Sequence, residues 1–398
     1  MNNHEKLTVK GFKFAAVSAG LKKNNALDLG LIFSEKPAVC AGVFTTNKVV
    51  AAPVQLTAQR VASGDCQAIL VNSKNANACT GAQGLQDASA CSTVVSQGLQ
   101  IDDSQVAIAS TGVIGQRLDA DKISSAIPHL IDQLDSESAL AVAEAMMTTD
   151  SFFKISAAYG EAAGKGYNLL GIAKGAGMIH PNMATMLAFV VTDAAIPREF
   201  LDKALRQAVD SSFNRITVDR DTSTNDTVLV LANGAGSAEI TDPSADAETF
   251  ANLLQQVLLD LAKMIVSDGE GATKLVRIQV EGAASDADAL MAAEAVATSN
   301  LVKTAFFGED ANWGRIIAAV GYSGAEVDPD SVDIRVGDIL LAENGLAGSP
   351  DQEEAATAIM KLPEFTITID LKLGEGQAYY YTSDLTYDYV KINADYRT

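Results

Sequence analysis

Short apolar runs bounded by turn residues constrain the fold of this chain more than any other feature of its sequence. Runs of this kind predict strands, because turn residues on both sides leave room only for a short extended segment. They span residues 27–34, 39–46, 66–73, 105–111, 226–234 and 274–282. The run over residues 14–21 predicts an early strand and turn.

Longer periodic segments alternate with these runs and predict helices. They span residues 135–147, 197–213, 247–269 and 286–306. Residues 364–393 alternate around a Gly-Glu-Gly turn and predict a hairpin whose sheet ends near Asn393. The mixture predicts an α/β or α+β fold in which broad sheets are covered by helices.

Composition and charge exclude several classes of function. A net charge of -21 repels phosphate backbones, so we expect no nucleic-acid partner. The four cysteines lack CxxC spacing, so the sequence gives little support for a zinc site. So few cysteines in a long chain fit the reducing cytoplasm, where disulfides are rare. The longest uncharged stretch holds Pro, Asn and His, and residues 14–21 lie too late for a signal peptide. We therefore expect a cytoplasmic protein that does not span a membrane.

The stretch "HPNMATMLAF", residues 180–189, places Thr185 at the mouth of an apolar run. A glycine-rich approach, "GIAKGAGMI", precedes it. The simplest interpretation makes Thr185 the first residue of a core strand, since threonine is common in strands. The glycines do not match a dinucleotide fingerprint, and no GxSxG elbow accompanies His180.

Several polar loops recur where apolar runs and helices end. They are "STGVIG" from residue 110, "MTTDSFFK" from residue 147, "VDRDTSTNDTV" from residue 218 and "SDGEGATK" from residue 267. Each alone is typical of a turn or a helix cap. Only their combination with the stretch around Thr185 is distinctive.

The combination resembles the ornithine acetyltransferase family, the ArgJ-type enzymes of arginine biosynthesis. "KGAGMIHPNMATMLAFVVTDA" is similar to the self-processing segment of that family. The resemblance covers the whole chain and includes "NANACTG", "STGVIG", "MTTD", "SFNRITVDRDTSTNDTV", "SDGEGATK", "ANWGRI" and "NADYRT". The chain departs from the family pattern at three loop positions: Lys74 and Arg220 stand in place of Gly, and Ala311 in place of Pro.

The resemblance implies self-cleavage between Ala184 and Thr185, giving fragments 1–184 and 185–398. An internal threonine hydroxyl is a weak nucleophile that needs a base. In the cut, Thr185 Oγ would attack the Ala184 carbonyl in an N-to-O shift. The cut frees an α-amino group with a pKa of roughly 8, and this amine could then take the proton from Oγ of the same residue. One hydroxyl would thus serve both cleavage and catalysis.

The resemblance also implies a ping-pong transfer of an acetyl group. Thr185 would take the group from N2-acetyl-L-ornithine and pass it to L-glutamate, giving L-ornithine and N-acetyl-L-glutamate. The donor is either N-acetylornithine alone or N-acetylornithine together with acetyl-CoA. Thr111 and Gly112 would stabilise the oxyanion, which needs donors close to it. The family's substrate contacts fall on Thr148, Lys174, Thr185, Glu270, Asn393 and Thr398.

Lys174 would hold a substrate carboxylate, and Glu270 would hold an ammonium group or order the site. The implied fold is that of the DmpA/ArgJ-like self-processing proteins. A stacked-sheet sandwich flanked by helices would span residues 1–280, and a smaller α/β domain over residues 281–398 would bring its tail to the active site. We expect no cofactor or metal, and an assembly of two copies of each fragment.

Two other functions fit the same residues. A self-cleaving aminopeptidase or amidase would use the same activation chemistry and pass the acyl group to water. A non-catalytic amino-acid-binding protein would keep the fold and stay uncut. Denaturing electrophoresis separates the uncut protein from both enzymes, and an assay with an acetyl acceptor separates the two enzymes.

Overall fold

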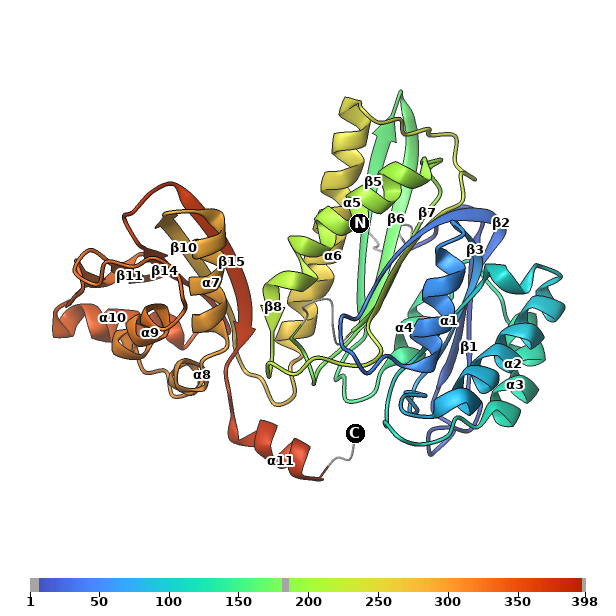
Figure 1. Cartoon of the computed structure of the whole chain (residues 1–398), viewed down its shortest axis with the longest axis horizontal. Helices are drawn as coiled ribbons and strands as arrows, with labels where there is room; N and C mark the ends of the chain where they lie inside the picture. Colours follow the sequence, from blue (N-terminus) through green and yellow to red (C-terminus); the bar gives the residue numbers. More distant parts are fainter. Residues whose placement is uncertain (1–6, 181–185, 396–398) are drawn as a thin grey trace.

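The computed structural model of the chain describes residues 7–180 and 186–395, which form two units, each built on its own sheet (Figure 1). In the larger sheet the strand order is β4-β3-β2-β9-β7-β6-β5, with β1 paired to β2. Its strands are β1 Phe12–Val17, β2 Leu29–Phe44, β3 Asp65–Asn72, β4 Val106–Ser110, β5 Lys154–Ala162, β6 Lys165–Lys174, β7 Leu187–Thr192 and β9 Thr227–Ala232.

The central strand β7 is buried on both faces, which explains its continuous apolar sequence. Ala188 and Val190 pack on one side, and Leu187 and Phe189 pack on the other. The parallel pairing of β7 with β9 aligns Leu187 with Thr227. The residues immediately before these two strands are therefore neighbours at one edge of the sheet.

Helices cover both faces of the larger sheet. The helix α4 lies on the side of Leu187 and Phe189, whereas α5 and α6 lie on the side of Ala188 and Val190. The helices of this unit are α1 Ala52–Val61, α2 Gly81–Leu99, α3 Ala120–Asp132, α4 Ala139–Met146, α5 Arg198–Asp210 and α6 Ala245–Ser267. The helix α6 is long and apolar enough to cross a membrane, but its apolar positions belong to the protein core.

The smaller sheet has the strand order β13-β12-β11-β14-β10-β15-β8. Its strands are β8 Ile216–Thr217, β10 Leu275–Ala283, β11 Asp333–Val336, β12 Ile339–Glu343, β13 Leu346–Ala347, β14 Glu364–Asp370 and β15 Gly376–Ser383. The helices of this part are α7 Asp286–Ala297, α8 Asn300–Phe307, α9 Trp313–Gly321, α10 Pro350–Met360 and α11 Tyr387–Asp395. Because β8 comes from the segment after α5 and pairs with β15, the chain crosses between the units more than once.

The predicted fold class is confirmed: the protein is mixed α/β, with two sheets flanked by helices. The sequence-based division after residue 280 falls inside β10.

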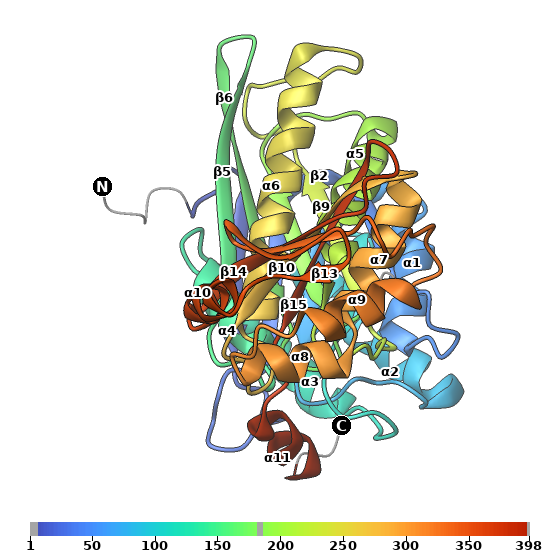
Figure 2. The same cartoon turned by 90° about the vertical axis from the view of Figure 1, so that its left-hand side faces the viewer.

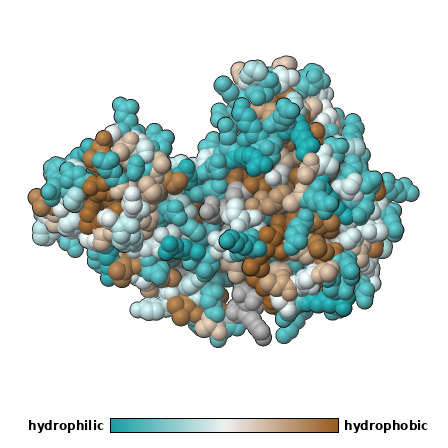
Figure 3. Space-filling view, in the orientation of Figure 1, coloured by the Kyte–Doolittle hydropathy of each residue, from teal (hydrophilic) through white to brown (hydrophobic). Residues whose placement is uncertain are grey.

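In the turned view, α11 lies at the end of the molecule away from the tips of β5, β6 and α6 (Figure 2). The surface view shows hydrophilic side chains over both units and a concentration of apolar side chains on the larger one (Figure 3).

Four local predictions differ from the structure in their bounds or their pairing. The runs 27–34 and 39–46 form one strand, β2, whose register with β3 shifts between Phe33 and Ala38. The helix predicted over residues 135–147 begins only at Ala139. The helix predicted over residues 286–306 is two helices, because the Ser299 side chain accepts the N–H of Val302 and starts α8.

The predicted hairpin over residues 364–393 is the fourth prediction that differs from the structure. The strands β14 and β15 do not pair with each other; both pair with β10, which lies between them. The sheet ends at Ser383, and the residues around Asn393 form α11 in place of a strand.

Candidate active site

A cavity of about 180 Å³ lies where the ends of β4 and β6 meet α11 and the loop after α6. Six of the predicted site residues line it: Thr111, Gly112, Thr148, Lys174, Glu270 and Asn393. Its other lining residues are Ala76, Ile114, Thr149, Gly177, Met178, Asp219, Asp221, Ser223, Thr224, Asn225 and Tyr389. Ala184, Thr185 and Thr398 lie outside the described residues.

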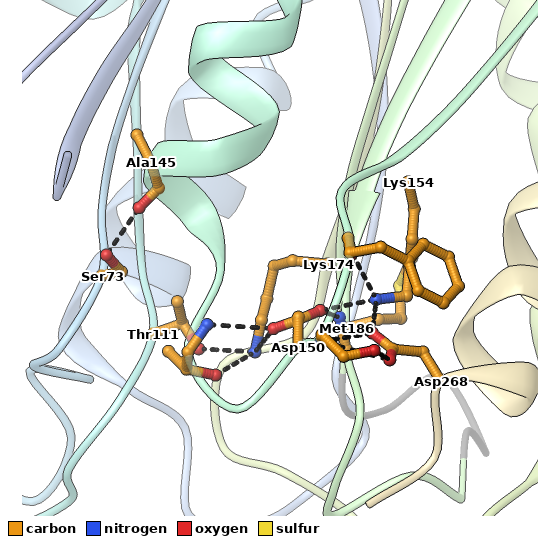
Figure 4. Close-up of polar contacts among 12 residues, drawn as sticks. Ser73, Thr111, Ala145, Asp150, Lys154, Lys174, Met186 and Asp268 are labelled. Atoms are coloured by element: carbon orange, nitrogen blue, oxygen red, sulfur yellow. Dashed lines mark hydrogen bonds and ion pairs between the residues drawn. The ribbon is translucent and has the colours of Figure 1, made fainter. Parts of the chain in front are cut away.

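Lys174 connects two of the predicted hydroxyl residues. It is the last residue of β6, and its Nζ donates to Thr148 Oγ1 at 3.0 Å and to Thr111 Oγ1 at 3.3 Å. Figure 4 shows its side chain running toward Thr111 and the carboxylate of Asp150. Burial lowers the pKa of Lys174, while Asp150 opposes that shift. The lysine is thus a buried cation aimed at the cavity.

Asp150 supports this lysine from the loop after α4. Its Oδ2 lies 4.0 Å from Lys174 Nζ, and it accepts the N–H groups of Thr148 at 2.9 Å and Gly175 at 2.7 Å. Burial alone would raise the pKa of Asp150, but the Lys174 and Lys154 cations together hold it well below its usual range. Asp150 therefore stays ionised and fixes the backbone on both sides of the lysine.

A second ion pair extends the same network. Lys154 Nζ lies 2.8 Å from Asp150 Oδ1 and 2.6 Å from Asp268 Oδ2, and all three side chains are buried (Figure 4). Asp268 follows α6, and it also accepts the Ser151 N–H at 3.0 Å. The network thus ties the loop after α4 to the loop that carries Glu270.

Thr111 and Gly112 follow β4 and differ in what they can donate. The Thr111 N–H already donates to the Asn72 carbonyl at 3.0 Å, while its hydroxyl accepts from Lys174. A hydroxyl that accepts a hydrogen bond keeps its own proton to donate, so the side chain is the donor Thr111 can offer. Gly112 has φ +131°, and a Cβ there would stand 2.2 Å from the Lys74 carbonyl carbon. Only glycine fits this tight turn.

Glu270 joins the C-terminal helix to the cavity. Its N–H donates to the Ala176 carbonyl at 2.9 Å, and its Oε2 accepts from Asn393 Nδ2 at 2.8 Å. A Cβ on Gly177 would stand 2.4 Å from the Glu270 carboxyl carbon, so a larger residue there would displace this carboxylate. The structure therefore places α11, and with it Asn393, beside Glu270.

Sequence reasoning missed the side chains that hold these groups in place. Asp150, Lys154 and Asp268 lie within polar loops that the sequence singled out, but nothing local shows that Lys154 reaches Asp268. Asp219 is also missed; its carboxylate accepts the N–H groups of Met178 at 2.6 Å and Ile179 at 2.7 Å. Within residues 7–180 and 186–395, no group of three or more His, Cys, Asp or Glu side chains is placed to hold a metal ion.

Comparison with known proteins identifies the family. The ArgJ family model matches residues 13–398. The chain belongs to the ArgJ family. A protein of Syntrophotalea carbinolica named "Arginine biosynthesis bifunctional protein ArgJ" is 61% identical over 392 residues, which cover 98% of this chain and 99% of the relative. A protein of the same name from Geobacter sulfurreducens is 56% identical, covering 98% of this chain and 100% of the relative.

A solved structure is similar over part of the chain. The crystal structure of the arginine biosynthesis bifunctional protein argJ from Bacillus halodurans shares 46% sequence identity with a TM-score of 0.50. It covers 52% of this chain and 98% of that crystal chain. Family membership confirms the prediction of an acyltransferase of arginine biosynthesis that acts on small amino-acid substrates.

Proposed function

We propose that this ArgJ-family protein cleaves itself between Ala184 and Thr185 and then uses Thr185 to move an acetyl group from N2-acetyl-L-ornithine to L-glutamate. The observation that carries the proposal is the convergence of Thr111, Gly112, Thr148, Lys174, Glu270 and Asn393 on one cavity. These residues come from segments spread over the chain, and each carries a role by resemblance to the family.

The charges of the cavity fit the proposed donor. Acetylornithine carries one carboxylate and one side-chain ammonium group. Lys174 provides the cation for the carboxylate, while Glu270, Asp219 and Asp221 give the lining an excess of acidic groups suited to the ammonium. Because the net charge of the chain is -21, a carboxylate needs this local cation to bind.

The proposed chemistry uses the donors next to Lys174. When Thr185 Oγ attacks the acetyl carbonyl, negative charge develops on the carbonyl oxygen. The Thr111 hydroxyl and the Gly112 N–H are the groups that would stabilise it, and Lys174 beside Thr111 adds positive charge. Ornithine then leaves, and glutamate accepts the acetyl group from Thr185.

Two fragments also agree with the Bacillus halodurans crystal chain, which spans about half of this one. Electrophoresis of the purified protein under denaturing conditions tests the cut. N-terminal sequencing of both fragments then locates it. We expect two bands, one of which begins at Thr185. A single full-length band with acetyltransferase activity would show that the uncut chain is the enzyme.

Incubation with N-acetylornithine and glutamate tests the transfer. We expect equal amounts of ornithine and N-acetylglutamate. Release of free acetate without N-acetylglutamate would favour the amidase alternative, and substrate binding without turnover would favour the binding protein.

Acetyl-CoA is the second proposed donor, because both relatives named above are called bifunctional. A parallel assay with acetyl-CoA and glutamate should then give N-acetylglutamate as well. Loss of both reactions in Thr185→Ala would show that they share one nucleophile, whereas survival of the acetyl-CoA reaction alone would require a separate site.

We further propose a cytoplasmic enzyme with two copies of each fragment and a C-terminal domain that begins near residue 280. Light scattering on the purified protein measures its mass. A mass near that of one chain would contradict the four-fragment assembly.

A further inference from the structure

A second cavity lies at the junction of the two units. Its volume is about 550 Å³, which is typical of a small-molecule site. The segment between α5 and β8 forms one wall, and β10 and β15 of the smaller sheet form the other. Among the described residues, none lines both this cavity and the one that holds Lys174. We call it the arginine cavity, because Arg215 and Arg277 both line it.

Strand alternation turns the polar side chains of β10 toward this cavity. Alternate residues of β10 pack in the core of the smaller unit, so Arg277, Gln279 and Glu281 lie on the other face of the strand. All three line the arginine cavity. Tyr379 of β15 stands directly opposite Gln279 in the antiparallel pairing and lies on the same face. One face of the sheet therefore presents a guanidinium group, an amide, a carboxylate and a phenol ring to the cavity.

Arg215 reaches the same face from the other wall. It directly precedes β8, and the pairing of β8 with β15 keeps it beside that strand (Figure 1). Its Nε donates to the Asp210 carbonyl at the end of α5, at 2.9 Å. The hydroxyl of Tyr379 donates to the Ser211 carbonyl at 2.5 Å and so ties the two walls together. The fold thus brings two arginines that are far apart in the sequence to one cavity.

Both guanidinium groups lack acceptors for part of their N–H donors. Arg277 Nη2 donates to Gln279 Oε1 at 2.6 Å, and the guanidinium carbon lies 5.1 Å from the centre of the Tyr379 ring. Arg277 Nε and Arg215 Nη1 are nevertheless buried nitrogens with no hydrogen-bond partner among the described residues. Glu281 lines the same cavity, yet no described carboxylate lies within 4.0 Å of either guanidinium group. Buried donors without partners are rare and costly, so this pair points to an acceptor that the described chain does not supply.

We propose that the arginine cavity binds a small molecule through its carboxylate or phosphate group, which Arg215 and Arg277 hold. A guanidinium group matches such an oxyanion, because it can donate two parallel N–H bonds to the oxygens. Because the net charge of the chain is -21, two neighbouring cations without a carboxylate partner also form a local centre of attraction for an anion. The site is separate from the candidate active site and does not depend on the proposed reaction.

Equilibrium dialysis at low ionic strength measures the binding of labelled inorganic phosphate and of labelled succinate to the purified protein. Arg277→Gln removes one guanidinium group and its charge-assisted hydrogen bonds, so it should bind the anion at least about 10-fold more weakly than the parent. The matched control is Arg206→Gln, which removes an arginine of α5 that is 60% exposed and paired with Asp202. The control should bind like the parent.

Lys174→Met separates this site from the candidate active site. It removes the cation that lines the active-site cavity and leaves both arginines of the arginine cavity in place, so binding should persist. Binding of phosphate alone, or of succinate alone, would support the site and show which oxyanion it accepts. Loss of binding in Lys174→Met with unchanged binding in Arg277→Gln would place the anion in the active-site cavity and overturn the proposal. Failure of the parent to bind either probe would overturn it too.

Arg215→Gln is the second variant, because it changes the opposite wall and leaves β10 and β15 intact. It should weaken binding by a similar factor. Melting without an added anion shows that each variant is folded, and folded Arg215→Gln and Arg277→Gln proteins that bind like the parent would refute the site.

Crystals of the parent protein give a test that needs no variant. Soaked in selenate, an oxyanion with a strong anomalous signal, they should show an anomalous peak between the guanidinium groups of Arg215 and Arg277. A peak only beside Lys174, or no peak at all, would contradict the proposal.

Discussion

Lys154 is the residue whose loss should most destabilise the site without removing any group proposed to contact substrate. Its ammonium group, fully buried, lies between the carboxylates of Asp150 and Asp268. Lys154→Met keeps a similar volume but leaves two buried carboxylates without their shared cation. Removal of one partner from a buried ion pair costs about 3–5 kcal/mol, and we expect a loss of that size in the free energy of unfolding.

Urea unfolding, followed by far-ultraviolet circular dichroism, measures this loss. Both variants are made in the Thr185→Ala background, so that a single covalent chain unfolds. The control is Lys203→Met, which removes an ion pair with Asp242 at 3.6 Å in which the lysine side chain is 59% exposed. Exposed pairs contribute about 0–1 kcal/mol, so the control should differ little from the parent.

The acid dependence of stability gives the same prediction a second readout. The pKa of Asp150 is depressed in the folded protein, so its contribution to stability is present above its unfolded pKa of about 3.9 and is lost as the pH falls through the folded value. Without Lys154 the folded pKa rises. Stability of Lys154→Met should therefore fall less than that of the parent as the pH drops below about 3.9, and its fall should end at a higher pH. A variant whose free energy of unfolding lies within about 1 kcal/mol of the parent's, with the same dependence on pH in acid, would refute the role of this network.

Three further predictions follow from individual contacts. Thr111→Ala should lower kcat by about 10²–10³-fold with little change in KM, because the Thr111 amide is already bonded to Asn72 and only the hydroxyl can donate to the oxyanion. Thr111→Ser keeps a hydroxyl and should retain most activity. A raised KM with unchanged kcat would make Thr111 a binding residue. Asn393→Ala removes the 2.8 Å bond to Glu270 and should raise KM for substrate about 10-fold while leaving self-cleavage intact; unchanged KM values would show that α11 plays no part in binding. Lys74 has φ +78°, a left-handed conformation that is strained for a residue with a side chain. Lys74→Gly should therefore stabilise the protein by about 0.5–1 kcal/mol in a melting experiment, whereas Lys48→Gly in an exposed loop should not. A lower melting midpoint for Lys74→Gly would contradict the presence of strain at this position.

Strands and helices with strong local patterns could be predicted from the sequence. The run 66–73 is β3 and the long helix pattern is α6, because burial on known faces leaves a periodic signal in the sequence. The hairpin prediction failed for a non-local reason: β10 enters the sheet between β14 and β15, and nothing in residues 364–393 encodes that insertion.

The C-terminal helix failed for a different reason. None of the residues of α11 is buried, so its sequence carries no apolar stripe to distinguish a helix from a strand. Its position depends on a few polar contacts, such as the Thr386 hydroxyl donating to the Gly271 carbonyl at 2.8 Å. Contacts of this kind are made between distant segments and leave no periodic pattern.

The candidate site shows the same division. Motifs around Thr111, Lys174 and Glu270 could be found one by one, because each loop has an unusual local composition. The Lys154–Asp268 pair and the contact between Asp226 and Met186 could not, because each joins residues that only the folded sheet brings together.

The two departures from the family pattern at Lys74 and Arg220 fall on left-handed backbone positions, with φ +78° and +67°. Glycine is favoured at such positions, which explains the expected residue.

Intact-mass spectrometry of the purified protein incubated with N-acetylornithine and no glutamate tests the central claim most directly. The account predicts two fragments, with the mass of one acetyl group added to the fragment that begins at Thr185 and located on that residue by peptide mapping. Addition of glutamate should remove the acetyl group and release N-acetylglutamate. An uncut chain, or an acetyl group carried on any residue other than Thr185, would contradict it.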